Sequence, residues 1–316
     1  MRLATVLTPL DHTNLTLAAQ CGVTDVTLRY PGSDLSLLVE HKQHVEAAGM
    51  HVCAIEGYLP IENIKLGNDN RDEDLAELTT LIEFMGKAKI PVLCYNFMAG
   101  TDWVRTDIAA PTRGGALTTR FNLQAAKQAV SLNLKEDSSD TKSITTDELW
   151  KNLEEFLNQI IPIAEANNVA LAMHPDDPPL AEFQGRARIM NSVENFERLL
   201  EMNSSAAHGI CFCQGTFAEM GVDIPNAIRR LGSRIKYVHF RDIVGSKEEF
   251  TETFHDAGQT DMAAAMRAYR EVNFTGPLRP DHVPQLIREE GGEPGYTMLG
   301  RLFAYGYIRG LMHATE

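Results

Sequence analysis

Four residues with metal-binding side chains stand at the ends of four apolar segments. They are His174 in HPDDPP, Cys213 in CFCQG, His239 in VHFRD and Asp281 in RPDH. Two imidazoles, a thiolate and a carboxylate can together bind a divalent transition metal, and Mn²⁺, Fe²⁺, Co²⁺ or Zn²⁺ would fit this donor set. Each residue alone could be structural. The metal-site hypothesis therefore rests on the four occurring together.

Position along the strand decides which cysteine is the better ligand candidate. Residues two apart in a strand share a face, so side-chain orientation does not separate Cys211 from Cys213. Cys213 lies nearer the end of its segment, where the other three candidates also lie. We therefore predict Cys213 as the ligand.

Further polar residues lie close in sequence to these segment ends. Arg241 follows His239 by two residues and could bind a carboxylate with both of its terminal nitrogens. His282 adjoins Asp281, and Tyr296 follows in GYTMLGR. The candidates for substrate binding are Asn96 and Arg105 in NFMAGTDWVRTD, Arg241, and His255 in ETFHDAGQTDM.

The elements that carry these residues alternate between two kinds. Short apolar segments rich in β-branched residues are separated by longer segments with helical periodicity, which predicts a parallel sheet built from βα units. Eight such strands would close into a (β/α)8 TIM barrel, whose active sites lie at the C-terminal ends of the strands. We place the strands at residues 3–7, 25–29, 51–56, 91–96, 169–174, 209–213, 235–240 and 277–281.

The domain organisation is predicted to be simple. No linker or internal repeat divides residues 1–316, so a single α/β barrel domain is expected. One connection, residues 106–143, is longer and more polar than a barrel needs. Such an excursion after a strand usually covers the mouth of the barrel or is mobile. Thr145 and Glu148 then form a capping-box pattern that predicts the start of a helix.

Composition limits the classes of partner. The formal net charge of −14 argues against nucleic acid or an anionic membrane surface. No segment approaches the roughly 18 apolar residues of a membrane span, and the first residues lack the apolar core of a signal peptide. Five cysteines without framework spacing favour reduced thiols in the cytoplasm. A small-molecule substrate is expected, and a homo-oligomer is a general expectation for barrel enzymes.

Several longer motifs, taken in order, resemble the mannonate dehydratase family of xylose-isomerase-like barrels. They are CYNFM and DWVRTD, MHPDDPP, FCQG, HFR, FHDAGQTDM, RPDH and GYTMLGR. The resemblance implies His174, Cys213, His239 and Asp281 as ligands, with Mn²⁺ as the usual metal. It also implies loss of water from D-mannonate to give 2-keto-3-deoxy-D-gluconate, a hydro-lyase reaction. His282 and Tyr296 would be the acid–base pair, with the assignment of acid and base left open.

Two loops depart from the family pattern. LRYPGSD (residues 28–34) and IEGYLPIENIK (residues 55–65) match weakly, and Tyr30 and Glu56 stand near places where the family leads us to expect histidines. A related aldonate is therefore an alternative substrate. A sugar isomerase or epimerase of the same superfamily is a second alternative, disfavoured by Cys213 and by the lack of Glu or Asp at the ends of the fifth and sixth strands. A non-catalytic barrel that binds a metal or a sugar acid is the third.

Overall fold

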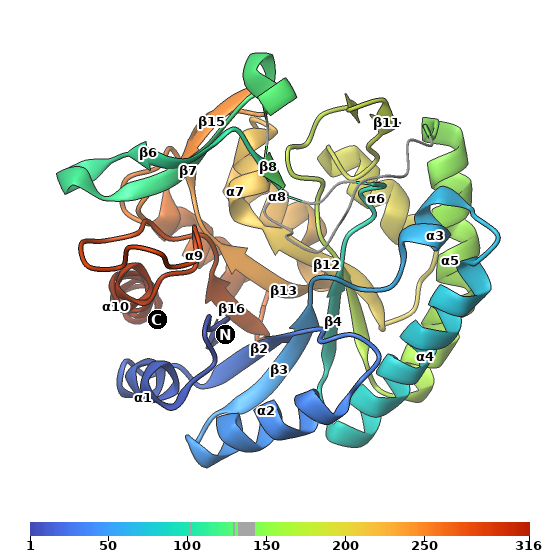
Figure 1. Cartoon of the computed structure of the whole chain (residues 1–316), viewed down its shortest axis with the longest axis horizontal. Helices are drawn as coiled ribbons and strands as arrows, with labels where there is room; N and C mark the ends of the chain where they lie inside the picture. The colour runs from blue at the N-terminus through green and yellow to red at the C-terminus, as the bar shows by residue number, and fades with distance from the viewer. Residues whose placement is uncertain (101–102, 129, 132–142) are drawn as a thin grey trace.

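A closed barrel of eight parallel strands forms the centre of the protein, and helices surround it (Figure 1). The computed structural model describes residues 1–100, 103–128, 130–131 and 143–316. Around the barrel the strand order is β1-β16-β13-β12-β9-β4-β3-β2. Their bounds are β1 (Arg2–Thr5), β2 (Asp25–Arg29), β3 (His51–Glu56), β4 (Val92–Tyr95), β9 (Ala170–Met173), β12 (His208–Cys213), β13 (Ile235–Phe240) and β16 (Pro277–Pro280). The predicted (β/α)8 barrel is confirmed.

The predicted strand bounds agree with the structure to within one or two residues at an end. Those predicted at 25–29, 51–56 and 235–240 match β2, β3 and β13. His174 and Asp281 were placed inside strands, but each is the first residue after its strand, β9 and β16. Both side chains thus belong to the loops at the C-terminal end of the barrel. We call this end the mouth.

The helices lie around the barrel, and each contributes buried residues to the hydrophobic core. They are α1 (His12–Gln20), α2 (Ser36–Ala47), α3 (Glu62–Leu66), α4 (Arg71–Ala88), α5 (Thr146–Ala166), α6 (Val193–Glu201), α7 (Gln214–Glu219), α8 (Ile224–Leu231), α9 (Met262–Glu271) and α10 (Met298–Ala314), with 3-10 turns at Arg113–Gly115, Leu123–Gln128 and Gly232–Arg234. The capping box predicted at Thr145 and Glu148 is present, with both reciprocal hydrogen bonds. None of the described helices is long and apolar enough to cross a membrane.

The described part of the excursion, together with the two residues before it, contributes short strands outside the barrel. These are β5 (Val104–Arg105), β6 (Asp107–Pro111), β7 (Leu117–Asn122) and β8 (Val130–Ser131); residues 129 and 132–142 lie outside the described residues. β6 and β7 join β14 (Ile243–Ser246) and β15 (Glu249–Glu252) in a four-stranded sheet of order β14-β15-β7-β6, seen at the top left of Figure 1. The strands β10 (Glu182–Phe183) and β11 (Arg186–Ala187) form a separate hairpin. Closure of the mouth by the excursion stays a prediction.

Candidate functional site

The structure brings the four predicted metal ligands together at the mouth. The ligand atoms of His174, Cys213 and His239 all lie within 4.8 Å of one another. Asp281 Oδ2 lies 3.9 Å from Cys213 Sγ and 3.7 Å from His239 Nδ1. The barrel register explains part of this, because Cys213 on β12 pairs directly with His239 on β13.

The environment of His174 fits a metal ligand. Its Nδ1 lies 2.7 Å from the carbonyl oxygen of Pro175, which can only accept, so Nδ1 carries the hydrogen and Nε2 keeps its lone pair. That Nε2 is buried and has no hydrogen-bond partner among the described residues. Metal-binding histidines are usually oriented in this way, with the second ring nitrogen held by a hydrogen bond. The donor set of two imidazoles, a thiol and a carboxylate therefore fits a divalent transition metal.

Charge around the cluster favours the ionised forms of its two acidic members. Burial raises the pKa of Cys213, but Arg241 and His174 outweigh it and hold that pKa well below the usual range of a thiol. Burial likewise opposes ionisation of Asp281, yet Arg279 and neighbouring histidines hold its pKa well below normal. Thiolate and carboxylate are the forms that bind metals.

Arg241 and Arg105 link the cluster to a buried network of carboxylates on one side. Arg241 pairs with Asp281 at 3.1 Å and with Asp177 at 2.9 Å. Arg105 donates to both oxygens of Asp177, at 2.7 and 3.0 Å, and to Glu252 at 2.6 Å. Both guanidinium groups are fully buried. Each is therefore already matched by carboxylates of the protein.

Arg279 and Glu56 support the cluster from the other side. Arg279 pairs with Asp281 at 2.7 Å and with Glu56 at 2.8 Å. Glu56 Oε2 in turn lies 3.2 Å from Nε2 of His239. Burial opposes the ionisation of Glu56, but Arg279 and His239 lower its pKa to about 2. We did not single out Arg279 from the sequence, although its spacing of two from Asp281 was an available signal.

His282 and Tyr296 lie next to each other, with ring centroids 5.3 Å apart. Nδ1 of His282 lies 2.6 Å from Oε1 of Glu252. Burial, reinforced by Asp281, raises the pKa of Tyr296, so its phenol stays protonated. His255 lies against Phe240, and burial lowers the pKa of His255 to about 4. Its imidazole is therefore neutral near pH 7.

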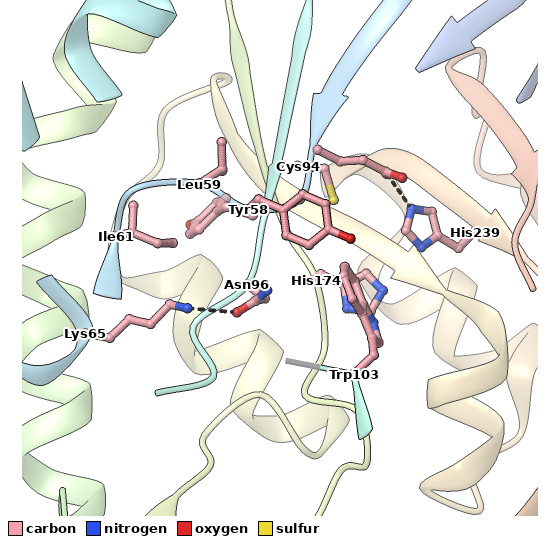
Figure 2. Close-up of a pocket in the computed structure, with 12 residues that line it drawn as sticks. Tyr58, Leu59, Ile61, Lys65, Cys94, Asn96, Trp103, His174 and His239 are labelled. Carbon is pink, nitrogen blue, oxygen red and sulfur yellow. Dashed lines mark hydrogen bonds and ion pairs between the residues drawn. The ribbon is translucent and has the colours of Figure 1, made fainter. Parts of the chain in front are cut away.

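Two adjoining pockets open beside the cluster, sharing Glu56, Gly57, Tyr58 and Trp103. The first is also lined by Asn96, Lys65, Cys94, His174 and His239, and Figure 2 shows these side chains around it. The second is also lined by Arg29, His282, Glu293 and Tyr296.

Of the predicted substrate-binding residues, one lines a pocket and three do not. Asn96 lines the first pocket, where its Oδ1 accepts a hydrogen bond from Lys65. Arg105, Arg241 and His255 line neither pocket. Their assignment as substrate contacts stays a prediction.

Known proteins resemble this chain over most of its length. The mannonate dehydratase of Oceanobacillus iheyensis is 35% identical over 295 residues, which cover 87% of this chain and 84% of the relative. That of Streptococcus equi subsp. zooepidemicus is 36% identical over 305 residues, covering 89% and 83%.

Solved structures extend the comparison. The crystal structure of mannonate dehydratase from Streptococcus suis serotype 2 superimposes with a TM-score of 0.86 at 30% identity, covering 100% of this chain and 95% of that one. A structure of L-ribulose 3-epimerase, with a TM-score of 0.64 at 14% identity, shares the fold alone. The model of the family described as D-mannonate dehydratase (UxuA) matches residues 11–316. The chain therefore belongs to the D-mannonate dehydratase family, as its motifs predicted.

Proposed function

We propose that this chain is a hydro-lyase that converts D-mannonate into 2-keto-3-deoxy-D-gluconate and water. We further propose that it does so with a divalent metal, Mn²⁺, held by His174, Cys213, His239 and Asp281. The main support for this proposal is geometric. The ligand atoms of His174, Cys213 and His239 lie within 4.8 Å of one another, next to a pocket lined by His282 and Tyr296. Membership of the dehydratase family favours this reaction over sugar isomerisation on the same fold.

The reaction requires a proton to leave C2 and the hydroxyl at C3 to depart as water. A bound divalent metal would supply a Lewis acid for the negative charge that develops beside the substrate carboxylate. His282 fits the base, because donation from its Nδ1 to Glu252 leaves the lone pair on Nε2. Tyr296 fits the acid, because its phenol stays protonated and can donate to the departing hydroxyl. Positioned groups of this kind each contribute about 10²–10⁴-fold to the rate.

Arg29 is proposed as an additional contact to the anionic substrate. It is the arginine that lines the second pocket, where its guanidinium carbon lies 4.7 Å from the centroid of the Tyr296 ring. Its side chain is partly exposed and pairs with Glu293 at 2.7 Å. A guanidinium in this place can bind a carboxylate in a bidentate manner, and Asn96 can orient hydroxyl groups from the first pocket.

The direct test is formation of a keto acid by the purified, Mn²⁺-loaded protein from a panel of aldonates that includes D-mannonate and D-gluconate. We expect product from D-mannonate. Product from another aldonate alone would keep the chemistry and reassign the substrate. Interconversion of ketose and aldose without any keto acid would overturn the proposed reaction.

The ligand set has its own test. His174→Ala is expected to lose metal and activity together, as measured by elemental analysis and by the keto-acid assay. His208→Gln is the matched control, because His208 is buried in the same barrel but lies at the start of β12, away from the cluster. Full metal content in His174→Ala would show that the assigned ligands are wrong.

A further inference from the structure

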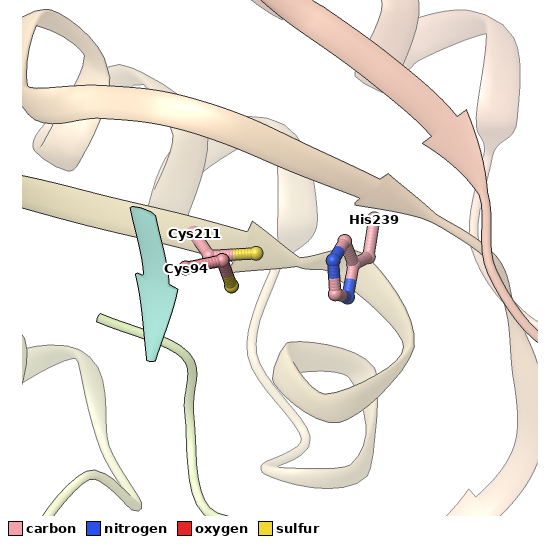
Figure 3. Close-up of side chains that lie close together, drawn as sticks. All are labelled: Cys94, Cys211 and His239. Carbon is pink, nitrogen blue, oxygen red and sulfur yellow. The ribbon is translucent and has the colours of Figure 1, made fainter. Parts of the chain in front are cut away.

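A second group of potential ligands lies beside the first. Cys94 on β4, Cys211 on β12 and His239 on β13 place their ligand atoms within 4.8 Å of one another. All three side chains are buried. Figure 3 shows the two sulfur atoms close together, with the imidazole of His239 beside them.

The barrel geometry explains how two cysteines on separate strands can meet. β9 lies between β4 and β12, and the residue of β9 that pairs with Cys94 is Ala172. Ala172 packs in the same interior cluster as both cysteines, and its small side chain leaves room for the sulfur atoms to approach. Because Cys211 and Cys213 share a face of β12, this strand supplies one thiol to each group of ligands.

We propose that Cys94, Cys211 and His239 form a second metal site, selective for a thiophilic divalent cation such as Zn²⁺ or Cd²⁺. Two sulfur donors and one imidazole are a soft set that suits these ions, whereas Mn²⁺ prefers oxygen donors. Three protein ligands with a fourth position left open are a usual arrangement for zinc. Any thiol that is protonated releases its proton to solvent when the cation binds.

An entry route is present. Cys94 and His239 both line the first pocket, so a cation that enters the mouth can reach them (Figure 2). Cys211 lies deeper and is fully buried. The site is therefore reached by the path that leads to the proposed catalytic metal.

Both groups of ligands contain His239, so metal binding at one proposed site affects metal binding at the other. A thiophilic cation bound to Cys94, Cys211 and His239 withdraws this imidazole from the group formed with His174 and Cys213. Zn²⁺ is therefore expected to inhibit the Mn²⁺-loaded enzyme by competing for His239. This consequence rests on the proposed function, whereas the existence of the second site does not.

The site is tested by ¹¹³Cd NMR of the full-length protein, because the cadmium resonance moves downfield with each thiolate ligand. The unmodified protein is expected to give a resonance typical of two thiolate ligands. Cys211→Ala and, separately, Cys94→Ser should each lose it. Cys213→Ala should keep it, as should Cys53→Ala, a matched control that removes another buried thiol of the same interior cluster. Absence of the resonance from the unmodified protein, or its survival in a correctly folded Cys211→Ala protein, would overturn the proposal.

The coupling is tested by inhibition. The Zn²⁺ concentration that halves the activity of the Mn²⁺-loaded enzyme should rise at least tenfold in Cys211→Ala and stay unchanged in Cys53→Ala. Equal inhibition of Cys211→Ala and the parent would refute competition through His239. Should the protein lack dehydratase activity, the proposed function fails, and the cadmium resonance still decides the second site.

Discussion

At the scale of single residues, the site depends on buried charges that are each matched by an opposite charge. Arg105 forms ion pairs with both Asp177 and Glu252. Glu252 also accepts a hydrogen bond from the imidazole of His282. Removing one member of such a buried pair usually costs about 3–5 kcal/mol, because the remaining charge is left without compensation. Glu252 therefore has two roles in our proposal: it stabilises the fold and fixes the tautomer of His282.

Replacement of Glu252 tests both roles. Glu252→Gln keeps the shape but removes the charge facing Arg105 and His282, so we expect the free energy of unfolding to fall by about 3 kcal/mol and kcat to fall more than KM changes. Urea denaturation and steady-state kinetics measure the two effects. Glu249→Gln, at an exposed position of the same strand, should change the free energy of unfolding by less than about 0.5 kcal/mol. Similar values for the two variants would contradict the role of Glu252.

The hydroxyl of Tyr296 can be removed without disturbing its ring. Tyr296→Phe keeps the packing against Arg29 and His282, so we expect KM and metal content to stay close to those of the parent. Loss of the proposed acid should lower kcat by about 10²-fold or more. Tyr307→Phe on α10, outside both pockets, should leave kcat unchanged. An undiminished kcat in Tyr296→Phe would remove this residue from the proposed mechanism.

The cluster at the mouth could be predicted from the sequence because each ligand candidate stands at the end of a recognisable strand. The ion pairs among the charged residues around it could not. Glu252 contacts Arg105, which is 147 residues away in the sequence, and His282, which is 30 residues away. Local periodicity carries no information about such pairings, because they depend on how separate loops meet above the barrel.

At the scale of elements, the barrel strands were predictable and the outer sheet was not. Barrel strands are apolar and flanked by helical segments, which is a strong pattern. β6, β7, β14 and β15 are short and partly exposed, and they depend on distant partners: Thr251 on β15 pairs with Arg120 on β7. For residues 106–143 the sequence therefore predicted only a long polar excursion that covers the mouth or is mobile, and it did not predict the strands of the outer sheet.

Aromatic packing holds this outer sheet together. The rings of Phe121 and Phe250 stack with centroids 5.6 Å apart, and both side chains are buried. We expect Phe250→Ala to lower the free energy of unfolding by about 3–5 kcal/mol. Val244→Ala, at a residue on the neighbouring strand that is 51% exposed, should change it by less than about 0.5 kcal/mol. Chemical denaturation measures both, and a small effect of Phe250→Ala would show that the sheet packs only loosely.

At the scale of the whole molecule, stability depends on pH through buried groups outside the site. Nε2 of His208 donates to the carbonyl oxygen of Leu199 at 2.9 Å, and burial lowers the pKa of His208 below its usual value of 6.5. Between these two pKa values the unfolded chain binds more protons than the folded one. The contribution of this residue is therefore fully present above about pH 6.5 and is lost as the pH falls.

Thermal unfolding at pH 7.5 and pH 5.5 tests this linkage. His208→Gln keeps a donor for Leu199 but cannot be protonated, so the difference in Tm between the two pH values should be smaller than in the parent. His12→Gln, at an exposed position on α1, should show the pH dependence of the parent. A parental pH dependence in His208→Gln would assign the acid sensitivity to other groups.

The four proposed ligands lie at, or one residue beyond, the C-terminal ends of β9, β12, β13 and β16, which are neighbours around the barrel. Arg29, Tyr58 and Asn96, which line the pockets, come instead from β2 and from the loops after β3 and β4. In our proposal the second half of the barrel supplies the metal ligands, and the first half contributes side chains that line the substrate pockets. On this proposal, we expect a chimera that takes its first four βα units from another dehydratase, with Glu56 retained, to keep its metal content and to change its substrate range, so that metal chemistry and substrate choice could diversify independently.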